Sequence, residues 1–210
     1  VIDLGGVDSV CEGSILDLGI LSNGNYSSSN PLIASVDVNG IVTANLQGTI
    51  DLSITDDNGC ISIPSILEIL PRPQINILGN DTICVGGTTL IDNLVGGTLS
   101  STNNSLINIT GGNLITGVTG GNLNLYLLDN ITGCVSDSAT QIVVIDLPVI
   151  DLGGVDSVCE GSILDLGILS NGNYSSSNPL IASVDVNGIV TANLQGTIDL
   201  SITDDNGCIS

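Results

Sequence analysis

The stretch Gly48-Thr49-Ile50-Asp51-Leu52-Ser53-Ile54-Thr55 alternates apolar and polar residues along its whole length. Successive side chains of a β-strand point to opposite faces of a sheet, so this alternation predicts a strand with one buried face. Residues 121–127 have the same pattern, Asn39-Gly40 is a hairpin signal, and Asp57-Asn58-Gly59 is typical of a turn. Many short strands separated by turns, with no helical spacing, indicate an all-β fold of β-sandwich type.

The chain repeats itself at two levels. Residues 149–210 repeat residues 1–62 without a substitution, which predicts an array. Within the longer unit, Asp8-Ser9-Val10-Cys11 recurs in related form as Asp81-Thr82-Ile83-Cys84. We therefore divide the chain into module one (1–73), module two (74–148) and module three (149–210), the last being a copy of module one truncated before its last strand.

The composition excludes several classes of function. One basic residue, Arg72, stands against 22 acidic ones, and the net charge is -21. Phosphate binding needs a basic surface, so we expect no nucleic-acid partner. The apolar runs are too short to span a bilayer, so no membrane insertion is expected either. Without His or Lys, no nucleophile has an evident activating base, and we expect no enzymatic activity, no catalytic residues and no cofactor.

Each module contains an early and a late cysteine at nearly constant separation. An even number per module predicts one disulfide inside each module, which suits small sandwiches with small cores and an oxidising, extracellular setting. Buried free thiols are the alternative, while zinc is disfavoured because two cysteines without histidine leave a site half built. The expected pairs are Cys11–Cys60, Cys84–Cys134 and Cys159–Cys208.

One segment resembles a known family. Residues 28–43, Ser-Ser-Asn-Pro-Leu-Ile-Ala-Ser-Val-Asp-Val-Asn-Gly-Ile-Val-Thr, followed by Gly48-Thr49-Ile50, resemble the bacterial immunoglobulin-like repeat, group 2. Cys11-Glu12-Gly13 and Asn58-Gly59-Cys60 are similar to modules of very large secreted adhesins of Bacteroidota. The resemblance implies tandem immunoglobulin-like β-sandwich modules, one disulfide each, on an extracellular protein exported by type IX secretion.

A short motif adds candidate modification sites. Each occurrence consists of Asp, a hydroxyl residue and a small apolar residue, and resembles the O-glycosylation signal of Bacteroidota. It recurs just before the first cysteine of every module, which predicts a glycoprotein. The candidate O-glycosylation sites are Ser9, Thr82, Ser138 and Ser157.

Calcium is the metal that the sequence leaves open, because hard cations take carboxylate and carbonyl oxygens from loops. The candidate ligands are Asp56 and Asp57 with their copies Asp204 and Asp205. No spaced calcium-loop motif occurs, and Asp in this position is favoured in a plain polar turn for its backbone hydrogen bonding, so the polar turn is the preferred interpretation.

These observations favour a structural role. Tandem modules extend in one dimension, so their number sets the reach of a stalk or shaft in a cell-surface filament or adhesin. We expect the partners to be other copies of the same chain in a filament, with a tip ligand that the sequence does not identify. The alternative is a set of low-affinity adhesive modules that bind glycans or partner surfaces and act by avidity.

Overall fold

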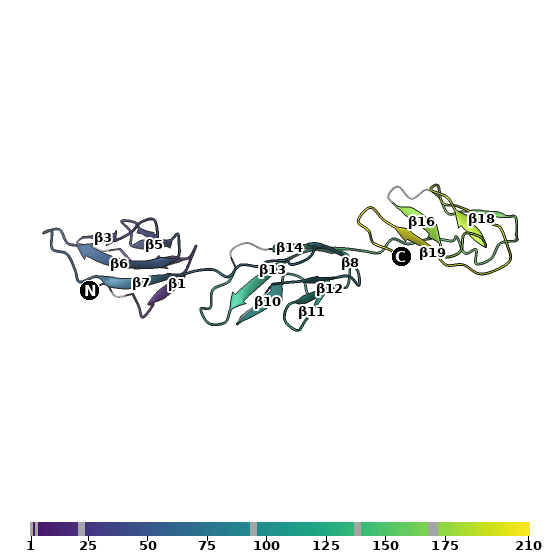
Figure 1. The fold of residues 1–210 in the computed structure, drawn as a ribbon. Helices are drawn as coiled ribbons and strands as arrows, with labels where there is room; N and C mark the ends of the chain where they lie inside the picture. The colour runs from purple at the N-terminus through teal and green to yellow at the C-terminus, as the bar shows by residue number, and fades with distance from the viewer. Residues whose placement is uncertain (1, 3, 21–23, 93–95, 137–139, 168–171) are drawn as a thin grey trace.

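The structure is a computed structural model that describes residues 2, 4–20, 24–92, 96–136, 140–167 and 172–210. The described residues contain strands and no helix, so the predicted all-β class is confirmed. Three bodies of strands follow one another along an extended chain (Figure 1). They correspond to the residues that we call modules one, two and three.

Module one contains two facing sheets, with strand orders β1-β7-β6-β3 and β2-β5-β4. The strands are β1 (Ser9–Cys11), β2 (Ile15–Asp17), β3 (Asn25–Ser28), β4 (Ala34–Val36), β5 (Ile41–Ala44), β6 (Gly48–Thr55) and β7 (Ser65–Leu70). β1 runs parallel to β7, whereas β7 and β3 are antiparallel to β6. The alternation in β6 has its expected consequence, because Ile50 and Leu52 are buried and Thr49 and Asp51 are exposed.

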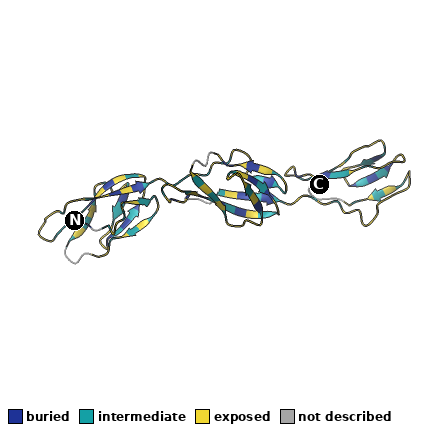
Figure 2. Cartoon of the chain, turned by 90° about the horizontal axis from the view of Figure 1, so that it is seen from below, coloured by how far each residue is buried: buried dark blue, intermediate teal, exposed yellow. Residues whose placement is uncertain are grey.

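Module two repeats this topology with the orders β10-β13-β14-β8 and β11-β12-β9. Its strands are β8 (Thr82–Cys84), β9 (Thr88–Leu90), β10 (Gly97–Ser101), β11 (Ile107–Thr110), β12 (Leu114–Gly117), β13 (Gly121–Asp129) and β14 (Thr140–Ile145). Each of the first two modules has its own apolar core of Ile, Leu, Val and Ala side chains. Figure 2 shows buried residues within the strands of each body, flanked by exposed ones, so the modules fold around separate cores.

Module three has fewer strands although its sequence copies module one. They are β15 (Ile163–Asp165), β16 (Asn173–Ser176), β17 (Ala182–Val184), β18 (Ile189–Ala192) and β19 (Leu200–Thr203), in sheets β15-β18-β17 and β16-β19. The described residues of module three, up to Ser210, include no counterpart of β7, the strand that pairs with both β1 and β6 in module one. Consequently residues 155–159 form no strand, and β19 is shorter than β6.

The hairpin signal at Asn39-Gly40 lies in the turn between β4 and β5. Asp37 Oδ1 accepts hydrogen bonds from the backbone N–H groups of Asn39 (2.9 Å) and Ile41 (2.8 Å). Gly40 has a φ of +82°, and a Cβ there would lie 2.1 Å from the carbonyl oxygen of Gly19. Glycine is therefore required at this position for its backbone conformation and for the close approach of the Gly19 loop.

Candidate functional site

The two disulfides of the structure join neighbouring modules. Cys11 of module one bonds Cys134 of module two, and Cys84 of module two bonds Cys208 of module three, each with a Cα–Cα distance of 5.6 Å. The remaining cysteines, Cys60 and Cys159, are free and exposed. The expectation of one disulfide inside each module is therefore wrong. The pairs that the structure does not contain are Cys11–Cys60, Cys84–Cys134 and Cys159–Cys208.

The strand register explains why the pairing within modules fails. Cys11 lies beside Leu70, at the end of β7 where the chain leaves module one. The late cysteine, Cys60, lies beyond the opposite end of β6, where its carbonyl oxygen accepts a hydrogen bond from Asp56 N–H. β6 separates these ends by about 23 Å at about 3.3 Å per residue. A disulfide needs Cα atoms within about 7 Å, so Cys11 cannot reach Cys60, and its partner in the structure is Cys134 of the next module.

The late cysteine sits in a closed turn. In module one, Asp56 Oδ1 accepts hydrogen bonds from the N–H groups of Asn58 (2.9 Å) and Cys60 (2.8 Å). Gly59 N–H also donates to the Asp56 carbonyl, and the φ of Gly59 is +83°. The Asp side chain thus replaces a backbone partner and fixes the direction in which the cysteine leaves the turn.

Module two builds the same feature with one more residue. Asp129 N–H donates to the Cys134 carbonyl at 2.9 Å, as Asp56 N–H does to the Cys60 carbonyl. Hydrogen bonds from the N–H of Ile131, and then from Thr132, lower the pKa of Asp129 below its usual value. The charged carboxylate is therefore the form that holds this turn.

The early cysteine also occupies a preformed turn. Gly13 N–H donates to the carbonyl of Ala44 at 2.7 Å, and Ser14 N–H donates to the carbonyl of Cys11 at 3.0 Å. At the same corner, Arg72 donates from Nε to the carbonyl of Glu12, which brings the joint between modules one and two against the cysteine turn. The peptide joint and the disulfide therefore leave module one at the same place.

The exact repeat provides an internal control for the effect of the junction. Cys60 and Cys208 occupy identical sequences and identical turns, since Asp204 Oδ1 accepts from Cys208 N–H at 2.8 Å. Yet Cys60 is exposed, whereas Cys208 is 1% exposed. We attribute the burial of Cys208 to the module bonded to it, because the local sequence and local hydrogen bonds are the same.

Of the candidate calcium ligands, Asp56 and Asp204 accept hydrogen bonds from the backbone of their own turns. Asp56 and Asp204 each use Oδ1 to accept two N–H groups, while their neighbours Asp57 and Asp205 are exposed. Across the parts of the chain that the structure describes, no three His, Cys, Asp or Glu side chains are grouped so that they could hold a metal ion. The geometry of these residues is that of the polar turn, which was the preferred interpretation.

Two of the candidate glycosylation sites lie on edge strands. Ser9 is exposed on β1, and Thr82 is partly buried on β8; each of these strands is the last in its sheet. Thr82 Oγ1 donates to Asp81 Oδ1 at 3.2 Å. Ser157 is exposed in a segment that forms no strand, and Ser138 lies outside the described residues.

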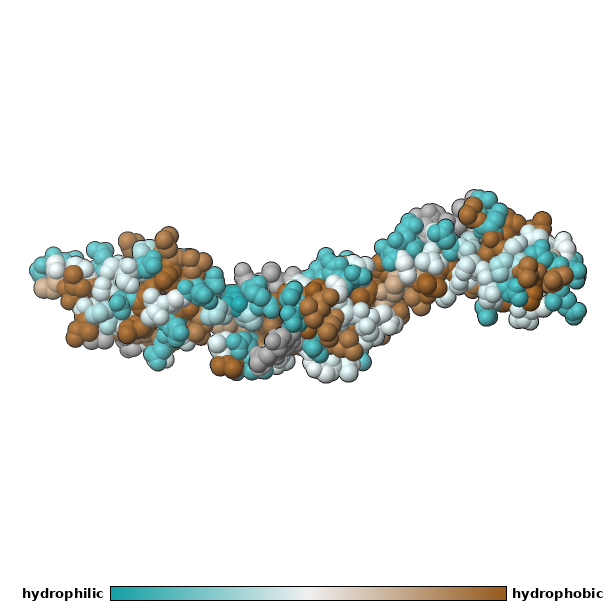
Figure 3. All heavy atoms as spheres, in the orientation of Figure 1, coloured by the Kyte–Doolittle hydropathy of each residue, from teal (hydrophilic) through white to brown (hydrophobic). Residues whose placement is uncertain are grey.

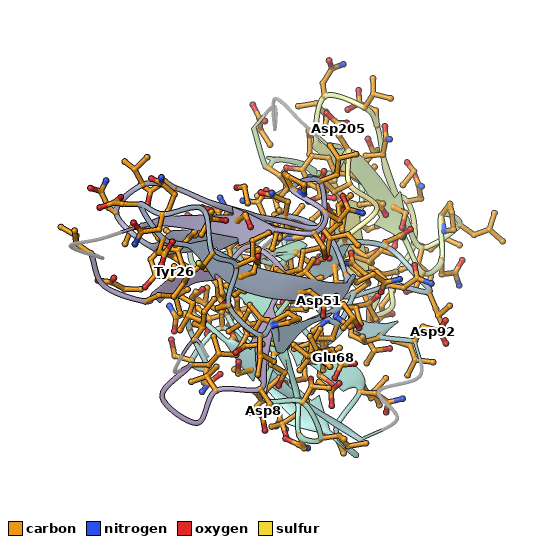
Figure 4. All side chains as sticks on the ribbon, turned by 90° about the vertical axis from the view of Figure 1, so that its left-hand side faces the viewer. Asp8, Tyr26, Asp51, Glu68, Asp92 and Asp205 are labelled. Carbon is orange, nitrogen blue, oxygen red and sulfur yellow. A yellow bond between two sulfur atoms is a disulfide. The ribbon has the colours of Figure 1, made fainter. Side chains whose placement is uncertain are left out.

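Acidic and apolar groups are spread over the surface. Seen along the length of the molecule, the labelled carboxylates Asp8, Asp92 and Asp205 lie on different sides (Figure 4). In the face drawn in Figure 3, hydrophobic and hydrophilic residues are intermingled over all three modules. Ile15 and Leu32 are among the large apolar side chains that are exposed. Among the described residues no helix is long and apolar enough to cross a membrane.

Module three carries a groove of about 880 Å³. Its apolar lining includes Ile150, Ala182, Val190, Ile198 and Leu200. The same positions in module one form the buried core beneath the inward side chains of β7. The groove is thus the space that β7 fills in the complete sandwich.

Comparison with known proteins identifies no family. No family model and no curated protein matches the chain. Among solved structures, invasin, a bacterial integrin-binding protein, matches with 12% identity, a TM-score of 0.38, and coverage of 91% of this chain and 52% of invasin. A Bacteroides ovatus protein, SGBP-B, solved with a mixed-linkage heptasaccharide, matches with 12% identity, a TM-score of 0.28, and coverage of 97% and 62%.

Drosophila OTK, extracellular domains 3–5, matches with 11% identity, a TM-score of 0.31, and coverage of 98% of this chain and 91% of that structure. The chain spans about half the length of the invasin structure that it matches. These TM-scores are below 0.5, so the matches assign neither a family nor a ligand.

Proposed function

We propose that this chain is a structural segment, a stalk or shaft, of a large extracellular cell-surface filament or adhesin. The observation that carries the proposal is that both disulfides cross a module junction, Cys11–Cys134 and Cys84–Cys208. Neighbouring modules are therefore joined twice, once by the peptide joint and once by a disulfide. A double connection of this kind is useful where modules bear tension or must keep a fixed order.

The disulfides create a second route for force. Tension that enters module two at Cys134 can leave it at Cys84, so it passes through the folded module without passing through either peptide joint. Cys84 ends β8 at one end of the module, and Cys134 follows β13 at the other. The route thus runs along the strands for most of the length of the module.

Module two is arranged to resist this load. β8 and β13 are both hydrogen-bonded to β14, which lies between them in the sheet. Pulling at Cys84 and Cys134 draws β8 and β13 in opposite directions along their axes. The hydrogen bonds of the antiparallel pair β13–β14 are roughly perpendicular to this direction, and those of the parallel pair β14–β8 are slanted. The force therefore shears the bonds of each pair together rather than breaking them one after another.

The composition supports the same proposal. Disulfides persist in oxidising, extracellular compartments. The net charge of -21 disfavours non-specific association, and one basic residue leaves almost no site for trypsin-like proteases. The resemblance to group 2 bacterial immunoglobulin-like repeats suggests a secreted Bacteroidota protein, and copies of the same chain are the partners that we propose.

Immunogold labelling of source cells with an antibody against module two would test the proposal. We expect gold particles distributed along the length of surface filaments. Labelling confined to filament tips or to the cytoplasm would contradict a shaft. Specific glycan-array binding by the purified chain would instead favour adhesive modules that act by avidity.

A further inference from the structure

The free cysteines Cys60 and Cys159 lie in the two outer modules and are of opposite kinds. Cys60 is a late cysteine, like the bonded Cys134 and Cys208, and Cys159 is an early cysteine, like the bonded Cys11. We propose that each is the open half of a further inter-module disulfide that pairs an early cysteine with a late one, and that Cys159 of one chain forms this bond with Cys60 of a second copy when that copy supplies the neighbouring module. This inference goes beyond the proposed function, because it would hold equally for a chain that bears no load.

The turn that holds Cys60 already has the conformation of a bonded late cysteine. Its turn matches the turn of the bonded Cys208 in sequence and in hydrogen bonding, with both cysteine N–H groups at 2.8 Å from the Asp carboxylate. The turn therefore does not depend on the disulfide for its shape. What distinguishes Cys60 is its exposure, which leaves the sulfur accessible to an incoming module.

The turn that follows Cys159 has the hydrogen bonds of its bonded counterpart, although Cys159 itself lies in no strand whereas Cys11 lies on β1. Gly161 N–H donates to the Ala192 carbonyl at 2.8 Å, and Ser162 N–H donates to the Cys159 carbonyl at 3.0 Å. These hydrogen bonds correspond to those around the bonded Cys11, which have lengths of 2.7 and 3.0 Å. Residues 151–160 are exposed throughout, so this corner of module three is open as well.

Pairing between unlike cysteines follows from the two junctions in the structure. Both join an early cysteine to a late one, with the same Cα–Cα distance of 5.6 Å, although one leads from module one to module two and the other from module two to module three. The junction therefore accepts both module types on either side. A bond between two Cys60 residues, or two Cys159 residues, would need a geometry that neither junction provides.

The reaction is an ordinary thiol–disulfide exchange. The Cys159 and Cys60 thiols give up two protons and two electrons as their S–S bond forms. A low-molecular-mass disulfide, such as oxidised glutathione, accepts them and leaves as two thiols. One S–S bond is broken for each one formed, and a mixed disulfide on one cysteine is the intermediate.

The test uses the full chain with oxidised glutathione, followed by non-reducing electrophoresis and disulfide mapping by mass spectrometry. Four proteins are compared: the original chain, Cys60→Ser, Cys159→Ser, and the double variant. We expect a ladder of covalent multimers from the original chain, with a peptide that joins Cys60 to Cys159. Each variant alone should remain monomeric and retain the Cys11–Cys134 and Cys84–Cys208 peptides, which shows that it is folded.

Mixing the two single variants provides the decisive control. The mixture contains one open early cysteine and one open late cysteine, so it should give dimers and no larger species. Dimers from either single variant alone, at the rate of the original chain, would overturn the proposal in favour of like-with-like pairing. Monomers throughout, with glutathione on both cysteines, would also overturn it.

Discussion

The staggered disulfides set limits on how far the chain can be stretched, and removing one of them should change those limits by a calculable amount. The perturbation is the double variant Cys11→Ser, Cys134→Ser, which deletes the first inter-module bond and leaves Cys84–Cys208. Neither cysteine belongs to the apolar cores of modules one and two, so the variant alters the connection between these modules and leaves both cores unchanged.

The limits follow from the shortest covalent route between positions 11 and 208. In the original chain this route crosses to Cys134, runs back about 50 residues to Cys84 and crosses again, which gives about 175–190 Å at 3.3–3.6 Å per residue. In the double variant the route runs about 73 residues from position 11 to Cys84 before crossing, which gives about 245–270 Å. Full reduction leaves about 197 residues and a limit of about 650–710 Å.

Single-molecule stretching with handles on enzymatic tags at both termini, and with free thiols blocked, would measure these limits. The original chain alone cannot test the pairing, because bonds inside each module would give nearly the same limit. The double variant separates the two cases. If the cysteines paired within modules, it would lose two bonds and reach about 490–540 Å. A limit in that range would refute the inter-module pairing and the force route built on it.

Three further results are expected. Gly40→Ala should destabilise module one by more than about 1–2 kcal/mol, because it adds a clash with the Gly19 carbonyl to the cost of a positive φ. Gly59 has a similar φ with nothing within 4 Å of an added Cβ, so Gly59→Ala should incur the conformational cost alone. Thermal unfolding of the two variants compares the two costs. Hydrogen bonds, chiefly from Ile41 N–H, lower the pKa of Asp37, so the contribution of this carboxylate to stability is complete above about pH 4 and is lost as the pH falls through the lowered pKa. Between about pH 7 and pH 2, Asp37→Asn should lose less free energy of unfolding than the original chain. An equal loss of free energy of unfolding would contradict this role. A peptide with the sequence of residues 63–73 should bind the module-three groove and slow its hydrogen exchange, and the same peptide with Leu67→Asp should not; equal binding of both would exclude insertion as a strand.

The strands were predictable because their signals are local. The alternation in residues 48–55 places Ile50 and Leu52 inside, and the sheet pairs this strand on both sides as a central strand. The Asn39-Gly40 turn was predictable for the same reason, since a positive φ favours glycine wherever the turn occurs. These features depend on a few adjacent residues and on burial of one face.

The cysteine pairing was not predictable from counting, because two patterns produce the same count. A constant spacing of early and late cysteines arises if each pair closes within a module and also if each early cysteine bonds the next module. What separates the patterns is the position of the parallel strand β1 beside the end of β7, which puts Cys11 a strand length away from Cys60. Part of the answer was visible in the sequence, since Cys60 precedes the last strand of its module, but the position of Cys11 beside the end of that strand comes from the structure.

The staggered pairing keeps the chain covalently connected when a peptide joint between modules is cleaved. The loops closed by Cys11–Cys134 and Cys84–Cys208 overlap, with separations of 123 and 124 residues, so every peptide bond between Cys11 and Cys208 lies inside at least one loop. A single cut anywhere in that span leaves one covalent molecule. Bonds inside each module would leave the joints, such as residues 61–83, outside every loop, and one cut there would sever the chain. For modules exposed outside a cell, the register of the disulfides therefore matters as much as their number, because only the staggered register carries covalent continuity across the joints.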